Sequence, residues 1–324
     1  MKQYFSEVFV VGNIGIPYTE LAEQTTESSV TVAELSSFQL ETVQEDFCPD
    51  VSMILNLTPD HLNRHYTMEN YGRAKLNVAL HQEETKTCIL NYEDPMLREF
   101  AKELRCRILW FSGEQTLENG LYLEEDRIIY AENNIRTEIC RTEELNIIGK
   151  HNYENAMAAI GAAVCIGVPL AAIRNGLKSF HAVEHRIEYV ATKKGVAYYN
   201  DSKGTNPDAA IKAIQAMTRP TLLIGGGYDK GSEYEEWIQA FEGKVKHLVL
   251  IGQTKEKIAQ TARQLGVPSV VLKETFEEAM QFCEENAVAG DAVLLSPACA
   301  SWGMFKNYEE RGNVFKEYVK GIKE

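Results

Sequence analysis

Short apolar runs, rich in β-branched residues, alternate with helix-length segments along most of this 324-residue chain. This alternation predicts a mostly parallel sheet whose faces are covered by helices. Two such series follow one another, with a boundary near Ala182 to Arg186. We therefore expect an α/β protein of two domains, residues 1–183 and residues 184–324, and we expect the second to be a doubly wound domain of its own.

The individual elements are predicted from the same alternation. In the first domain we expect strands at 8–11, 30–33, 51–57, 87–91 and 108–111, and an antiparallel hairpin at 121–131. Its helices are expected at 17–23, 70–81, 95–104, 151–164 and 170–177. In the second domain we expect strands at 187–192, 196–199, 221–224, 247–251, 269–272 and 292–296. Its helices are expected at 207–217, 234–241, 255–265, 276–285 and 308–320.

Composition restricts the classes of function. The sequence is 44% hydrophobic and 25% charged, which is ordinary for a globular chain with a core of useful size. Its net charge of -14 argues against nucleic acid and anionic membranes as partners, because phosphate contacts need clustered Lys and Arg. Seven cysteines without a C-x-x-C pair favour a reducing compartment, and we expect the cytoplasm.

One stretch approaches the length of a membrane span. Residues 156–173 carry no charge, but Gly161, Gly167 and Pro169 interrupt them. This pattern favours a close-packed buried helix, a turn and a second helix. The short, charged segment from Met1 to Glu7 does not have the pattern of a signal peptide. We therefore expect no membrane association.

Two predicted strands of the first domain end in polar residues. Glu34 follows the strand at 30–33, and His61 follows the strand at 51–57. Because ligands collect beyond the carboxyl ends of parallel strands, the two side chains are expected in one crevice, where they suggest a divalent metal. The alternative is that Glu34 caps a helix and His61 is an ordinary loop histidine. A zinc pair of His61 and His65 is less well supported, because a third ligand is missing nearby.

Three loops of the second domain also follow predicted strands. The first, Asn200 to Asn206, precedes a helix whose N-terminus can accept an anion, although a helix cap explains Thr205 and Asn206 equally well. The second, Gly225 to Lys230, begins with three glycines that allow close approach of a ligand, or that simply make a turn. The third is Ser296 to Ser301. Three such loops on one sheet edge favour a binding site.

These residues form motifs that run in order across nearly the whole chain. The motifs of the first domain are Gly12 to Gly15, Glu34 to Glu41, Asn56 to Arg64, Tyr71 to Lys75, and His151, Asn152 and Asn155. Those of the second are His185 and Arg186, Asn200 to Asn206, and Ser296 to Ser301 with Arg311 and Gly312. In these motifs the chain resembles the Mur ligases, most closely the members that add D-glutamate to a peptidoglycan precursor. The resemblance implies a central ATPase domain followed by a Rossmann-like domain that binds the amino acid.

The resemblance also implies an ATP-dependent amide ligation that serves cell wall biogenesis. The carboxylate of UDP-N-acetylmuramoyl-L-alanine would attack the γ-phosphate of ATP, and the amine of D-glutamate would attack the resulting acyl phosphate. Two Mg²⁺ ions that bridge phosphate and carboxylate oxygens would neutralise the developing charge. The expected state is a monomer.

The roles implied by the resemblance are assigned residue by residue. Glu34 and His61 would hold Mg²⁺, and a carbamylated Lys75 would be a further ligand, so that these three are the expected catalytic residues. The nucleotide would be contacted by Asn152, Asn155, Arg186 and Asp201, and the precursor by Asn13. The D-glutamate site would be formed by Lys203, Thr205, Lys230, Ser296, Ser301 and Tyr308, the last of which stands where the family often has Phe.

One departure from the family's pattern is large. The phosphate loop G-x-x-x-x-G-K-[ST] does not occur in these residues, and neither does an N-terminal UDP-binding domain of the order of one hundred residues. We therefore expect a fragment of a ligase, with exposed apolar strand edges and little activity alone. The alternatives are another ligase of the superfamily, such as folylpolyglutamate synthase, and a noncatalytic partner subunit.

Overall fold

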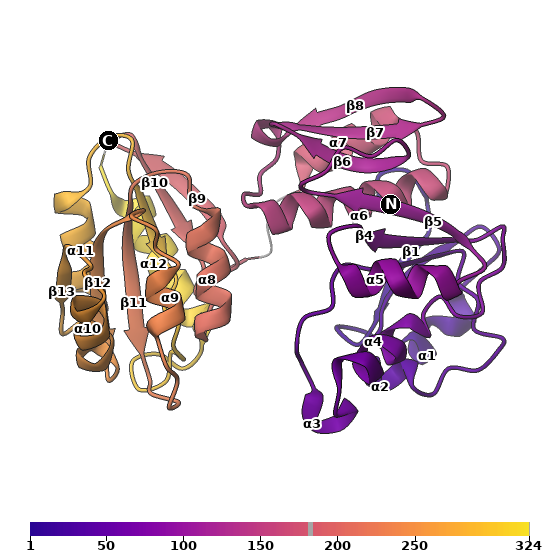
Figure 1. Ribbon diagram of the computed structural model, residues 1–324. Coiled ribbons are helices and arrows are strands. Elements are labelled where there is room, and N and C mark those ends of the chain that lie inside the picture. Colours follow the sequence, from indigo (N-terminus) through magenta and orange to yellow (C-terminus); the bar gives the residue numbers. More distant parts are fainter. Residues whose placement is uncertain (181–183, 324) are drawn as a thin grey trace. The chain divides into compact units, whose positions relative to one another are not determined.

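Two separate units make up the computed structural model, which describes residues 1–180 and 184–323 (Figure 1). The first unit contains Met1–Leu145 and Lys150–Phe180, and the second joins Asn146–Gly149 to the described residues from 184 onward. The predicted domain boundary adjoins residues 181–183, which lie outside the described residues, so the division at that position stays a prediction.

The first unit is built on a six-stranded sheet in the order β3-β4-β5-β6-β7-β8. The strands are β3 Val51–Ile54, β4 Thr87–Asn91, β5 Arg107–Ser112, β6 Gly120–Glu124, β7 Arg127–Glu132 and β8 Ile135–Arg141. The pairs from β3 to β6 are parallel, and the pairs from β6 to β8 are antiparallel. Helix α6, Lys150–Cys165, packs across the parallel strands, and α7, Leu170–Ser179, packs against α6 and β8 (Figure 1).

Close packing explains why the uncharged stretch at 156–173 is rich in small residues. A Cβ atom at Gly161 would lie 3.0 Å from Leu109 and 3.3 Å from Ile89, both of which are buried in the sheet beneath α6. The prediction of a close-packed buried helix, a turn and a second helix is therefore confirmed, although α7 buries only Ile173. Among the described residues, no helix has the length and apolar content required to cross a bilayer.

The remaining elements of the first unit lie on or beside this sheet. Strands β1, Val8–Gly12, and β2, Val30–Glu34, pair in parallel as a separate two-stranded sheet. The short helices are α1 Tyr18–Leu21, α2 Ser37–Leu40, α3 Leu62–His65, α4 Met68–Leu76 and α5 Pro95–Phe100, with 3-10 turns at Ala22–Gln24, Ala101–Glu103 and Thr142–Glu144. Helices α2 and α3 each pack against α4, which carries Lys75 of the predicted metal site. Glu34 of that site ends β2, and His61 directly precedes α3.

Two boundaries in this unit differ from prediction for visible reasons. Strand β3 ends at Ile54 instead of Leu57, because side chains satisfy the backbone that follows: Asp94 Oδ2 accepts from the N–H of Leu57 at 2.8 Å, and Asn91 Nδ2 donates to the carbonyl of Leu55 at 3.1 Å. Helix α4 begins earlier than expected, because the Thr67 side chain accepts from the N–H of residue 70 and caps it.

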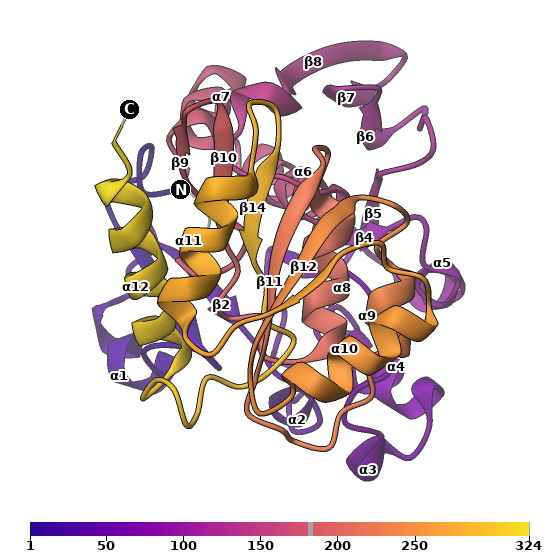
Figure 2. The same ribbon diagram turned by 90° about the vertical axis from the view of Figure 1, so that its left-hand side faces the viewer.

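The second unit is a doubly wound sheet in the order β13-β12-β11-β14-β10-β9, in which only β9 is antiparallel to its neighbour. The strands are β9 Glu188–Lys193, β10 Val196–Asn200, β11 Thr221–Gly227, β12 Val245–Gly252, β13 Val270–Leu272 and β14 Ala292–Leu295. The helices are α8 Pro207–Ala216, α9 Glu235–Gln239, α10 Lys255–Gln264, α11 Phe276–Asn286 and α12 Tyr308–Gly321. Figure 2 shows α11 and α12 on one face of the sheet and α8, α9 and α10 on the other.

Each face of this sheet buries its own hydrophobic core. Trp237 of α9 and Ile258 of α10 belong to the core on one face, and Met280 of α11 and Phe315 of α12 belong to the core on the other. The near-continuous apolar runs of the central strands follow from this arrangement, because both faces of a covered parallel sheet are dry. The fold thereby fixes the carboxyl ends of β10, β11 and β14, which are adjacent in the sheet and carry the three polar loops.

Candidate functional site

The ends of β1 and β2 bring Asn13 and Glu34 together in the first unit. The Asn13 backbone N–H donates to the Glu34 carbonyl at 2.7 Å, and its Nδ2 lies 3.4 Å from Glu34 Oε1. Gly12 has a φ of +122°, and a Cβ at this position would overlap the Glu34 backbone, so glycine is required for the two strands to approach so closely. Glu34 itself does not cap a helix, since the capping side chain of α2 is Ser36.

A cluster of rings joins α2, α3 and α4 next to the predicted metal ligands. The Phe38 ring lies 5.0 Å from the ring of His61 and 5.7 Å from that of His65, measured between centroids. The Tyr71 ring lies 5.3 Å from His65 and 6.4 Å from His61. His61 precedes α3 with a φ of 51°, and its Nε2 lies 3.5 Å from Oδ2 of Asp60. The ring cluster fixes the positions of His61 and of the first turn of α3.

Lys75 lies on α4 with its ammonium group over the ring of Tyr71, 5.1 Å from the centroid. Burial lowers the pKa of Lys75, while the nearby carboxylates of Asp60 and Glu34 raise it to a smaller extent. A lowered pKa increases the fraction of neutral amine, which is the nucleophilic form. Lys75 is therefore a partly desolvated amine close to two carboxylates.

The donors in this part of the first unit suit Mg²⁺ better than a metal whose ligands all come from the protein. Among the described residues, no group of three or more His, Cys, Asp or Glu side chains is placed to hold a metal by itself. The side chains of His61 and Asp60 are 47% and 62% exposed, so further ligands can approach. Mg²⁺ usually binds through one or two carboxylates together with water and substrate phosphates, and this arrangement fits that requirement. Asp60 was not selected from the sequence, although its place directly before His61 was a usable signal.

Asn152 and Asn155 lie in the first turns of α6, in the first unit. Their spacing of three residues puts both side chains on one face of the helix. The side chain of Asn155 is exposed, and that of Asn152 is partly buried. Both residues carry amide groups, which can donate and accept hydrogen bonds.

The three polar loops of the second unit meet at one edge of its sheet, as expected, because β11, β14 and β10 are adjacent and parallel. The loops after β11 and β14 are also joined directly, since the Tyr228 N–H donates to the Ala300 carbonyl at 2.9 Å. The Lys230 ammonium lies 5.0 Å from the ring centroid of Trp302, which follows Ser301. Trp302 is 53% exposed and also contacts the Tyr228 ring at 5.5 Å. Lys230 is thus held beside the third loop.

Asp201 follows β10 and is almost completely buried, with 4% exposure. Ser296 Oγ donates to its Oδ2 at 2.7 Å, and the Ile187 N–H donates to its Oδ1 at 3.2 Å. Burial raises the pKa of Asp201 to about 7, although both hydrogen bonds and the charges of Arg186 and Arg311 favour the anion. The hydroxyl of Ser296 is therefore turned towards Asp201 in this structure.

Arg311 of α12 connects the first loop, Asn200 to Asn206, with the third loop, Ser296 to Ser301. It is 1% exposed, and its Nε and Nη2 donate to Ser202 Oγ at 2.9 Å and to the Ser202 carbonyl at 2.8 Å. Its Nη1 donates to the Cys299 carbonyl at 3.2 Å. Burial lowers the pKa of Arg311 to about 10. The sequence marked Arg311 as part of a motif but gave no sign of this role, which depends on burial.

The remaining predicted residues of the second unit surround Tyr308, at the start of α12. The Lys203 ammonium lies 5.8 Å from the Tyr308 ring centroid, and the Lys203 N–H donates to the His185 carbonyl at 2.9 Å. The neighbouring Glu309 and burial raise the pKa of Tyr308, and the positive charge of Arg186 lowers it to a smaller extent. Thr205 is partly buried in the same loop, just before Asn206, whose side chain caps α8. The helix cap is therefore confirmed for Asn206, and a binding role of this loop stays a prediction.

Comparison with known proteins follows the same division of the chain. Residues 9–163 match the Mur ligase middle domain, and residues 185–299 match the Mur ligase glutamate ligase domain. The UDP-N-acetylmuramoylalanine--D-glutamate ligase of Lachnoclostridium phytofermentans is 60% identical over 324 residues, covering 100% of this chain and 71% of the relative. The ligase of the same name from Lachnospira eligens is 54% identical over 319 residues, covering 98% of this chain and 71% of the relative.

Solved structures of lower identity share the fold. The UDP-N-acetylmuramate-alanine ligase MurC of Thermotoga maritima has a TM-score of 0.64 at 16% identity, covering 99% of this chain and 77% of that one. The MurF ligase of Thermotoga maritima, solved in complex with ADP, has a TM-score of 0.62 at 18% identity, covering 98% of this chain and 81% of that one. At these identities the likeness concerns the fold alone.

Proposed function

The chain belongs to the Mur ligase family, and we propose that it carries the middle and C-terminal parts of the ligase that joins D-glutamate to UDP-N-acetylmuramoyl-L-alanine. The observation that carries this proposal is the 60% identity, over all 324 residues, with a relative named for that reaction. ATP supplies the driving force. The carboxylate of the precursor attacks the γ-phosphorus and ADP leaves, and the amine of D-glutamate then attacks the acyl carbon and releases phosphate.

In this proposal Glu34 and His61 hold Mg²⁺, which neutralises charge on the phosphates when it is bound. Asn13, hydrogen-bonded to Glu34, contacts the precursor. Asp60 adds a second carboxylate next to His61, and its distance of 3.5 Å from the imidazole Nε2 supports this assignment. The number of protein ligands stays small, so phosphate oxygens and water complete the coordination.

Lys75 is proposed to act as a carbamate. The ammonium group first loses a proton, and the neutral amine then adds to carbon dioxide and loses a second proton, so that a cation becomes an anion. The lowered pKa of Lys75 supports this step, since it increases the neutral fraction at neutral pH. Asp60 and Glu34 would repel a carbamate in the absence of a cation, so we propose that carbamylation and Mg²⁺ binding favour each other.

The nucleotide and the amino acid are assigned to different groups of residues. Asn152, Asn155, Arg186 and Asp201 are proposed to contact the nucleotide. The D-glutamate site is proposed at Lys203, Thr205, Lys230, Ser301 and Tyr308. Ser296 contributes to it through its hydrogen bond to Asp201. Two lysines suit a substrate that carries two carboxylates, and the contact between Lys230 and Trp302 supports a fixed position for one of them.

The 324 residues contain no G-x-x-x-x-G-K-[ST] run, and we propose that they turn ATP over slowly by themselves. A backbone cradle and a lysine for the β- and γ-phosphates must be supplied by further polypeptide. We also propose a cytoplasmic monomer, for which the seven free cysteines and the net charge of -14 are the support.

The test measures phosphate release from ATP with Mg²⁺, bicarbonate, UDP-N-acetylmuramoyl-L-alanine and D-glutamate. The 324-residue chain is compared with the same chain joined to the N-terminal part of the Lachnoclostridium phytofermentans relative, hereafter the joined enzyme. We expect D-glutamate-dependent release in the joined enzyme, no release with L-glutamate, and loss of release in its Lys75→Ala variant. Release that does not depend on D-glutamate would contradict the assigned substrate, and equal rates in both chains would contradict the need for a phosphate loop.

A further inference from the structure

We propose that Asn200 and Glu188 position the turn that presents Arg186 to the nucleotide. This inference rests on the proposed function, in which Arg186 contacts the nucleotide. Asn200 and Glu188 do not take part in the chemistry described above. Their importance follows from how they hold the backbone on both sides of Arg186.

The turn from His185 to Ile187 has an unfavourable backbone conformation. His185 has a φ of 65° and Ile187 a φ of 45°, in the left-handed region that a β-branched residue rarely adopts. Such conformations persist only where the surrounding structure enforces them, and they cluster at functional sites. The side chains of His185 and Ile187 are buried, whereas that of Arg186 is exposed. The conformation therefore turns one arginine outward between two anchored residues.

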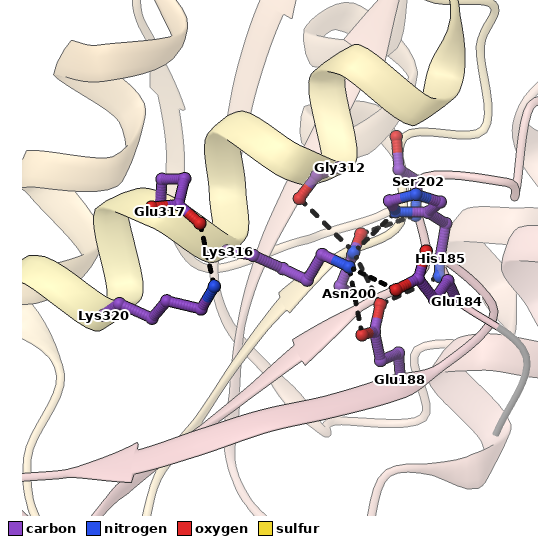
Figure 3. A network of polar contacts seen from close by, with 9 residues as sticks. All are labelled: Glu184, His185, Glu188, Asn200, Ser202, Gly312, Lys316, Glu317 and Lys320. Atoms are coloured by element: carbon purple, nitrogen blue, oxygen red, sulfur yellow. Dashed lines mark hydrogen bonds and ion pairs between the residues drawn. The ribbon is translucent and has the colours of Figure 1, made fainter. Parts of the chain in front are cut away.

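Asn200 and Glu188 hold the first residue of this turn (Figure 3). Asn200 Nδ2 lies 2.9 Å from His185 Nδ1 and 3.1 Å from Glu188 Oε2, and the same Glu188 oxygen accepts from the His185 N–H at 2.9 Å. Because the amide nitrogen of Asn200 can only donate, His185 Nδ1 is an acceptor and its ring proton is on Nε2. Burial and the charge of Lys316 lower the pKa of His185, which agrees with a neutral ring.

The network extends to both ends of the turn. The Lys316 ammonium lies 3.3 Å from a carboxylate oxygen of Glu184 and 3.3 Å from one of Glu188, so α12 anchors the residue before the turn and the residue after it (Figure 3). Gly312, one helical turn earlier on α12, leaves room for the His185 ring, which a Cβ would overlap. Asn200 Nδ2 also lies 3.4 Å from the Gly312 carbonyl.

Asn200 is suited to this task because both ends of its amide are engaged. Its exposure is 0%, and its Oδ1 accepts from the N–H of Ser202 at 3.1 Å while its Nδ2 donates to His185 and Glu188. An aspartate at this position would keep the shape but lose the donor, and it would place a carboxylate against that of Glu188. Asn200→Asp is therefore the variant that releases the turn with the smallest change in volume.

The experiment measures KM for ATP, KM for D-glutamate and kcat in the joined enzyme. We expect Arg186→Ala and Asn200→Asp each to raise KM for ATP by about tenfold, the size of one lost hydrogen bond to a charged group. KM for D-glutamate should rise less, because the turn contacts that site through the backbone of Lys203. The double variant should be no worse than either single one, because both remove the same interaction. Glu188→Gln, which keeps an acceptor oxygen, should retain a lower KM for ATP than Glu188→Ala.

Two controls separate positioning from a general loss of stability. Cys283→Ala removes a fully buried side chain on α11, away from the turn, and should lower stability without changing KM for ATP. Hydrogen exchange in the 324-residue chain gives a readout without activity. In Asn200→Asp the amides of Ile187 and Lys203, which bond Asp201 and His185 in the parent, should exchange faster.

The outcomes distinguish the inference from the proposal on which it rests. If Arg186→Ala leaves KM for ATP unchanged, the assignment of Arg186 to the nucleotide is wrong. If Arg186→Ala raises KM for ATP but Asn200→Asp does not, or if their effects multiply in the double variant, Asn200 does not position Arg186. Unchanged exchange at Ile187 and Lys203 in Asn200→Asp would also overturn the inference.

Discussion

Asp201 gives the structure a stability that should depend strongly on pH. Its carboxyl group is 4% exposed, and burial raises its pKa from the ordinary value of 3.8 to about 7. The hydrogen bonds from Ser296 and from the backbone of Ile187 lower this pKa, as do the charges of Arg186 and Arg311, but burial has the larger effect. We predict that Asp201→Asn removes most of the pH dependence of unfolding in the second unit.

The sign and size of the effect follow from the two pKa values. In the unfolded chain the carboxyl group loses its proton near pH 4, whereas in the folded protein it keeps the proton up to about pH 7. The folded state therefore binds more protons in this window, so the contribution of Asp201 to the free energy of unfolding is most favourable below pH 4 and falls as the pH rises to about 7. A shift of about 3 pH units corresponds to a loss of about 4 kcal/mol.

The assay is denaturation by urea between pH 4.5 and 8, followed by the fluorescence of Trp237, which is fully buried in the second unit. Trp110 and Trp302 are replaced by Phe in all proteins, so that one reporter remains. We expect Asp201→Asn to match its parent at pH 4.5 within about 1 kcal/mol and to exceed it by up to about 4 kcal/mol at pH 8. Parallel curves for the two proteins would refute the argument.

A matched variant tests the cause of the shift. The Ser296 hydroxyl donates to Asp201 Oδ2 at 2.7 Å, and this hydrogen bond favours the anion. Ser296→Ala removes it. Its loss should raise the pKa of Asp201 in the folded protein further, so that the fall in stability still begins near pH 4 but extends to higher pH. A fall that moves to lower pH in Ser296→Ala would show that this hydrogen bond does not favour the charged form.

Three further predictions concern single residues. Gly312→Ala places a Cβ on the His185 ring and should cost about 1–3 kcal/mol in urea unfolding, and an unchanged midpoint would contradict the packing. Trp302→Leu removes the ring next to Lys230 and should raise KM for D-glutamate roughly two- to fivefold in the joined enzyme, with KM for ATP as the unaffected control. With ¹³C-bicarbonate and Mg²⁺, a carbamate signal in the NMR spectrum should be absent from Lys75→Arg, and its persistence there would point to another lysine.

The sequence predicted strands best where they are buried on both faces. The fully buried strand β4 was predicted with its observed bounds, Thr87–Asn91, because a continuous apolar run leaves few other structures. Strand β8, Ile135–Arg141, was missed because four of its residues are charged or exposed. It pairs with β7, and the turn that joins the two strands is Asn133-Asn134, where both residues have positive φ. A hairpin signal was therefore present in the sequence and was not used.

The predicted end of β11 was wrong because its last three residues are glycines. The strand was expected to end before Gly225 but continues to Gly227. A Cβ at Gly225 would lie 2.7 Å from the ring of Trp237, and one at Gly226 would overlap the backbone of the neighbouring strand β12. These glycines are therefore inside the sheet because neighbouring atoms occupy the space of a side chain. Single-sequence patterns do not distinguish this cause from a turn, because the neighbours are distant in sequence.

The candidate sites were likewise predicted only in part. The sequence marked the loops, because polar residues after apolar strands are unusual, but it did not identify what holds them in place. Asp201, Arg311 and Asn200 are buried polar residues, and apolar residues of similar volume often make such interiors as stable or more stable. The three hydrogen bonds of Arg311 named above all go to neutral oxygens of the first and third loops. These contacts fix the spacing of the two loops more than they stabilise the core. Loss of Arg311 should therefore disturb the positions of Lys203 and Ser301 more than it lowers the stability of the unit.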